Sequence, residues 1–124
     1  MFEEIVEQGG VKITLKNTIA NQLLWRKRLE VFKITGDEFD ADVRYMFLEM
    51  SSHTLRIEGV RWTIPNGTAD AEVIEASYQE FIQLIPMDML RKCSETVHGM
   101  YGPLSDQLEK PESTLTKEEL ADPN

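Results

Sequence analysis

The chain has 124 residues, the size of a single ordinary domain. A hydrophobic fraction of 41% is enough for a packed core. The formal net charge of −9 argues against binding to nucleic acids or to anionic membranes, because both depend on clustered Lys and Arg.

The number of cysteines and the length of the apolar runs indicate the cellular compartment of the protein. The only cysteine is Cys93, so no disulfide can form within the chain. The opening sequence MFEEIVEQGG is acidic and lacks the basic and apolar regions of a signal peptide. No apolar run approaches the roughly 18 residues that a membrane span needs. We therefore expect a soluble, cytoplasmic protein.

The first predicted element is a strand. Val11, Ile13 and Leu15 alternate with polar residues, the pattern of a half-buried strand. A single strand needs a partner, and the candidates are residues 2–6 and 55–62. We expect a small hairpin or an edge pair.

A first helix is predicted over residues 19–31. Asn17 and Thr18 can cap it, because their side-chain oxygens can accept from the free N–H groups of its first turn. Gly36 is a plausible stop signal. The helix has a broad apolar face, made of Ile19, Leu23, Leu24, Trp25, Val31 and Phe32.

A second helix is predicted to end at Gly59. Asp37 and Asp40 supply capping and favourable negative charge at its start. Pro65, Asn66 and Gly67 then predict a turn. Helical spacing is shown by Val43, Met46, Phe47 and Met50, and continues to Thr54 and Ile57.

Two more helices are predicted on either side of Pro86. The third begins near Asp70, and Pro86 ends it and opens the fourth. Gly99, Gly102 and Pro103 are expected to stop the fourth. The apolar stripes are Ile74, Tyr78, Phe81, Ile82 and Ile85 in the third helix, and Met89, Leu90, Cys93, Val97 and Met100 in the fourth.

Residues 103–124 are rich in prolines and acidic residues and poor in apolar ones. Such a segment buries too little surface to offset about 1–2 kcal/mol of backbone entropy per residue. The sequence therefore predicts one mainly helical domain over residues 1–102 and a disordered acidic tail over residues 103–124. The fold class is a small bundle of about four helices with a minor N-terminal β strand or hairpin.

Residues able to carry catalysis are few. His53 and His98 do not stand at metal-ligand spacing to Cys93. We interpret Cys93 as an inert core residue and His53 as an ordinary surface or helix-end residue. No phosphate-binding glycine motif occurs, and the acidic residues 37–42 lack the glycine and the final Glu of a calcium loop. We expect no catalytic residue, cofactor or metal.

Candidate partner-binding residues are Trp25, Arg26, Lys27, Arg28, Trp62 and Met87. Residues 25–28 form the one basic cluster of an acidic chain, interpreted either as a solvated helix face or as a contact surface. Trp62 is interpreted either as a buried anchor or as an exposed interface residue. Methionines such as Met87 suit an adaptable apolar surface, because their side chains repack easily.

The order of elements resembles the small tail assembly chaperones of tailed bacteriophages. In that family a helix is followed by a short link of the form G–x–W/L–P, and a later helix runs directly into Leu-Pro and the final helix. The matching residues here are Gly59, Trp62, Pro65, Leu84-Ile85-Pro86 and Leu90.

The resemblance covers roughly residues 35–101. It implies a non-enzymatic protein of the host cytoplasm that binds the tape measure protein while the tail assembles. Alternatives are a structural or adaptor subunit of a phage tail or baseplate, and, outside phages, a regulatory binding module or an enzyme. Self-association is compatible with the same apolar surface. No nucleic-acid or membrane partner is expected.

Overall fold

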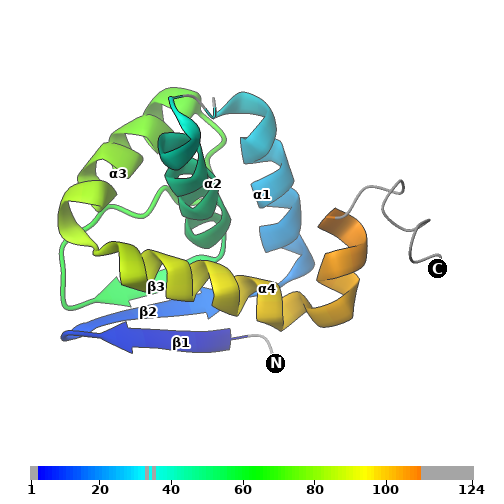
Figure 1. The fold of residues 1–124 in the computed structure, drawn as a ribbon, viewed down its shortest axis with the longest axis horizontal. Coiled ribbons are helices and arrows are strands. Elements are labelled where there is room, and N and C mark those ends of the chain that lie inside the picture. The colour runs from blue at the N-terminus through cyan, green and yellow to red at the C-terminus, as the bar shows by residue number, and fades with distance from the viewer. Residues whose placement is uncertain (1–2, 33, 35, 110–124) are drawn as a thin grey trace.

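The computed structural model describes residues 3–32, 34 and 36–109, with residues 102–109 as helical backbone only. Within these residues, four helices pack beside a small antiparallel sheet of three strands, which confirms the predicted fold class (Figure 1). The elements in chain order are β1 (Glu3–Gln8), β2 (Val11–Lys16), α1 (Ile19–Val31), α2 (Glu38–Ser52), β3 (Thr54–Glu58), α3 (Ala71–Leu84) and α4 (Met87–Glu109).

The predicted strand is the middle strand of the sheet. β2 pairs with β1 on one side and with β3 on the other, so both candidate partner segments are used. Gly9 and Gly10 both have positive φ, which a two-residue hairpin turn requires. Val6, Ile13 and Leu15 are buried, and α4 contacts both β1 and β2.

The predicted end of the second helix is wrong. α2 ends at Ser52, and Thr54–Glu58 forms β3 instead of a further helical turn. Ile57, which seemed to continue the helical spacing, pairs with Ile13 of β2. Pairing with β2 outweighs the local helical pattern, because β-branched residues pack well in a sheet.

Local signals place the helix starts correctly. Thr18 caps α1 in a capping box with Asn21. Asp37 caps α2 and Asp70 caps α3, each accepting from backbone N–H groups of the first turn. Pro86 stands directly before α4, and its carbonyl oxygen accepts from the backbone N–H groups of Met89 and Leu90 in the first turn of that helix.

The apolar face predicted for α1 is wrong in part. Ile19 and Leu23 are 79% and 61% exposed. The side that faces the interior carries Trp25, Arg28 and Phe32, at positions i, i+3 and i+7. Apolar spacing alone does not predict this buried stripe, because its middle position is an arginine.

The core takes side chains from β1, β2, all four described helices and the loop after β3. Phe47 of α2 is fully buried and meets three aromatic rings, those of Trp62, Tyr78 and Phe81, with centroids 5.1 to 5.9 Å away. Ile74, Tyr78 and Phe81 of α3 are buried as their spacing predicts, and so are Met89, Leu90, Cys93 and Val97 of α4.

The predicted stop of the fourth helix is also wrong. α4 continues through Gly102 and Pro103 to Glu109, so residues 103–109 are helical. A proline inside a helix removes one backbone hydrogen bond and favours a kink. Figure 1 shows the last turns of α4, in orange, turning away from the line of its first part. The rest of the predicted tail, residues 110–124, lies outside the described residues.

Candidate partner-binding groove

The structure separates the six predicted binding residues. Trp25, Arg28 and Trp62 are buried, so for these three the interpretation as surface residues is corrected. Arg26 and Lys27 are exposed on α1, and Met87 is half-buried at the start of α4.

Arg28 ties the segment after β3 to α1 and α2. Its Nε donates to the Thr68 carbonyl oxygen at 2.8 Å, and Nη2 donates to the Pro65 carbonyl oxygen. Nη1 donates to the Ser52 hydroxyl at 3.3 Å. Burial lowers the pKa of the guanidinium to about 10, so it stays charged at neutral pH. The role of Arg28 is to hold this loop.

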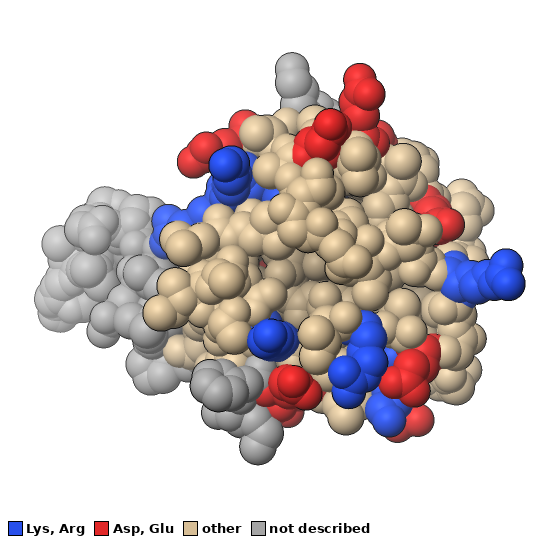
Figure 2. All heavy atoms as spheres, turned by 180° about the vertical axis from the view of Figure 1, so that it is seen from behind, with Lys and Arg blue, Asp and Glu red and all other residues tan. Residues whose placement is uncertain are grey.

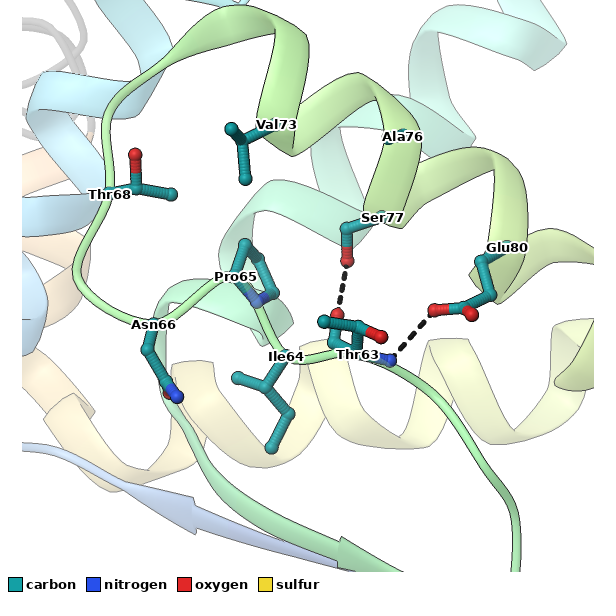
Figure 3. Close-up of a pocket in the computed structure, with 9 residues that line it drawn as sticks. All are labelled: Thr63, Ile64, Pro65, Asn66, Thr68, Val73, Ala76, Ser77 and Glu80. Carbon is teal, nitrogen blue, oxygen red and sulfur yellow. Dashed lines mark hydrogen bonds between the residues drawn. The ribbon is translucent and has the colours of Figure 1, made fainter.

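The same loop is held from α3 (Figure 3). Trp62 Nε1 donates to the Ser77 carbonyl oxygen at 2.9 Å, and the Ser77 hydroxyl donates to the Thr63 carbonyl oxygen at 2.7 Å. The Thr63 N–H donates to Glu80 Oε1 at 2.7 Å. Of the two interpretations of Trp62, the buried anchor is therefore the correct one.

A hollow of about 500 Å³ lies between this loop and α3 (Figure 3). Val73 points into it from the helix and Pro65 from the loop. Ser77 and Glu80 at its wall already bond to Thr63, and the Thr68 hydroxyl accepts from the Asp70 N–H. Its polar groups mainly hold the loop in place.

His53 is buried, so its interpretation as a surface residue is wrong, although it does end α2. Its Nδ1 lies 2.7 Å from the Glu49 carbonyl oxygen, which can only accept, so Nδ1 carries the proton. Nε2 can then only accept, and the Tyr101 hydroxyl lies 3.0 Å from it and 3.3 Å from the Thr18 carbonyl oxygen, so its single proton faces two acceptors. Burial lowers the pKa of His53 to about 4, and the nearby charge of Arg28 acts in the same direction, while the bond to Glu49 opposes them.

This depressed pKa predicts loss of stability in mild acid. An unfolded histidine takes up a proton near pH 6.5, but the folded one does so only near pH 4, so acid favours the unfolded state between these values. We expect His53 to cost about 2 kcal/mol of stability at pH 5 relative to pH 7.5. Urea unfolding at both pH values, with His53→Gln as control, measures this. Equal pH dependence of both proteins would contradict it.

A second buried polar cluster joins α2 to α4. Glu49 is fully buried, and Ser94 donates to its Oε1 at 2.5 Å. His98 Nδ1 lies 2.7 Å from its Oε2. Spacing along the sequence does not reveal this cluster, because its residues come from two helices that are far apart in the chain.

The order of groups in this cluster does not suit nucleophilic catalysis. The carboxylate lies between the serine and the histidine, whereas an activated serine needs the histidine beside it. Cys93 is buried and its pKa is raised to about 12, so its thiol stays protonated. Among the side chains that the structure describes, no three of His, Cys, Asp or Glu are grouped to hold a metal.

A groove with both apolar and charged lining residues, here named the Phe39–Met87 groove, lies where α2, α3 and α4 meet. It consists of two hollows of about 290 and 210 Å³ that share Phe39, Val43 and Met87. Phe39 is 59% exposed and Ile82 is 39% exposed at its edges. The other lining residues are Asp40, Asp42, Tyr45, Met46, Tyr78, Phe81, Ile85, Leu90 and Arg91.

Exposed apolar side chains also occur elsewhere. Ile19 and Leu23 lie one turn apart on the outer side of α1, but no described hollow includes them. Figure 2 shows the face opposite to that of Figure 1, where uncharged residues cover the middle and charged ones gather toward the margins.

Of the predicted binding residues, only Met87 lines the Phe39–Met87 groove. The sequence could not reveal this groove, because residues from three helices form it.

Comparison with known proteins identifies no family. No protein-family model matches the chain, and no solved structure matches it. Over an alignment 69 positions long, the chain is 35% identical to part of UDP-N-acetylmuramoyl-L-alanyl-D-glutamate--2,6-diaminopimelate ligase from Clostridium tetani (strain Massachusetts / E88). The match covers 48% of this chain and 14% of the ligase. Within the described part of the chain, no helix is long and apolar enough to span a membrane.

Proposed function

We propose that this chain is a non-enzymatic assembly chaperone that binds an apolar helical segment of a larger protein in the Phe39–Met87 groove. The observation that carries the proposal is an open groove whose edges hold exposed apolar side chains. A client helix would lay residues at i, i+3, i+4 and i+7 into such a groove.

The size of the groove fits transient binding. Burying an exposed Phe or Ile side chain fully contributes about 1.5–3 kcal/mol. Phe39 and Ile82 are already partly covered, so together they supply a few kcal/mol at most. Micromolar affinity corresponds to about 8 kcal/mol, so the client must add anchors of its own. Weak binding suits a chaperone that releases its client.

The resemblance to tail assembly chaperones supports the tape measure protein as the client and the host cytoplasm as the compartment. A structural or adaptor subunit of a tail or baseplate is the second candidate. The presence of the chain in purified finished particles would favour that second candidate over the chaperone.

Co-expression tests the proposal. The chain is produced together with a tape measure protein, the client that the resemblance implies, and the amount of soluble client is measured. Phe39→Asp should abolish solubilisation, because it places a charge in the apolar contact. Ile19→Asp, at an exposed apolar position outside the groove, should leave it unchanged.

Two results of these experiments would contradict the proposed function. Solubilisation by Phe39→Asp at the wild-type level would exclude the groove as the client site. Absence of any client, together with a turnover that His98→Ala abolishes, would replace the chaperone with an enzyme.

A further inference from the structure

The charges around the Phe39–Met87 groove are unequal. Asp40 and Asp42 belong to its lining, whereas Arg91 is the one cation among the lining residues. Two more acidic residues, Asp37 and Glu38, lie at the start of α2 immediately before Phe39.

The nearest cation on α2 is already engaged. Arg44 forms a two-point contact with Glu75 of α3, at 2.6 and 3.2 Å, and stacks on the Tyr78 ring. The Glu75 contact raises the pKa of Arg44, in keeping with a stable pair. Arg44 also attracts Asp40 electrostatically, but its hydrogen bonds go to Glu75. With Asp37, Glu38 and Asp42 beside it, the α2 side of the groove keeps an excess of acidic residues.

Resting on the proposed function, we infer that the occupant of the groove is an amphipathic helix with Lys or Arg beside its apolar stripe. The apolar side chains enter the groove, and the flanking cations face Asp40 and Asp42. Charges at a rim contribute mainly to partner choice and association rate, while apolar contacts supply most of the affinity.

Charge also disfavours the two occupants that this chain could supply itself. A symmetric pair of copies would place the same acidic rim of each groove near the other, and each copy carries a net charge of −9. Residues 110–124 contain Glu112, Glu118, Glu119 and Asp122 against two lysines. Both occupants bring acids to an acidic margin, so a basic partner fits better.

The test uses the full chain and two synthetic helical peptides of about 18 residues, or five turns. Both carry the same leucine stripe, flanked by Lys in one peptide and by Glu in the other. Fluorescence anisotropy at low ionic strength should show about three- to tenfold tighter binding of the Lys-flanked peptide, a preference that salt reduces.

Charge reversal supplies the matched control. The double variant Asp40→Lys and Asp42→Lys should reverse the preference, since its groove margin is basic. The double variant Glu30→Lys and Glu95→Lys changes the net charge equally at exposed positions that do not line the groove, and should keep the preference. Thermal unfolding confirms that both variants are folded.

The remaining outcomes distinguish failure of the inferred basic partner from failure of the proposed function. Equal binding of both peptides, lost in Phe39→Asp, would overturn the basic partner and leave the proposed function standing. Binding of neither peptide, with no client in co-expression, would overturn both. Competition by a peptide of residues 110–124 would make the chain's own terminus the occupant. A dimer that dissociates in the Phe39→Asp variant would mean that a second copy of the chain occupies the groove. Either this result or competition by the peptide would overturn the inference.

Discussion

Arg28→Ala is expected to lower the free energy of unfolding by about 3–5 kcal/mol, because it removes the buried donor of a hydrogen-bonded network. The carbonyl oxygens of Pro65 and Thr68 would lose their charged donor, and a cavity would remain at a fully buried position. Urea unfolding followed by circular dichroism measures the loss.

Two variants on the same helix sharpen this prediction. Lys27→Ala, at an exposed position beside Arg28, should change stability by less than about 0.5 kcal/mol. Arg28→Lys should recover only part of the loss, since a single ammonium cannot reach the three acceptors in the arginine's fork geometry. Equal stability of Arg28→Ala and wild type would contradict the assigned role of this side chain.

Phe47→Ala is expected to cost about 3–5 kcal/mol as well, the usual range for a buried aromatic residue. Its ring is fully buried against Trp62, Tyr78 and Phe81, which come from the loop and from α3. Because the free energy of unfolding of a typical domain is only about 5–15 kcal/mol, this loss removes a large part of the stability of the variant.

Phe39→Ala is the matched control for Phe47→Ala, because it is the same substitution on the same helix at an exposed position. It should cost less than about 1 kcal/mol. Chemical unfolding of both variants in parallel measures the difference. Similar losses at the two positions would mean that Phe39 is a core residue, and the groove would lose its exposed edge.

The elements that the sequence predicts correctly depend on neighbouring residues. Capping side chains such as Thr18 and Asp70 mark helix starts, and Pro86 separates α3 from α4. The alternation of Val11, Ile13 and Leu15 marks β2, because each residue's face in a strand follows from its neighbours.

The errors concern contacts between distant segments. Ile57 fits a helical stripe locally, but pairing with Ile13 places it in β3. Arg28 looks solvated until the carbonyl oxygens of residues 65 and 68 are brought to it. The same limit applies to the Phe39–Met87 groove, since spacing within one helix says nothing about how three helices meet.

The claim that the Phe39–Met87 groove binds a client helix is tested most directly by NMR on the ¹⁵N-labelled full chain. Titration with the leucine-stripe peptide, in its Lys-flanked form, should shift the amide signals of Phe39, Val43, Ile82 and Met87. The signals of Ile19 and Leu23, on the outer side of α1, should stay in place. Shifts centred on α1, with the groove signals unchanged, would contradict the account.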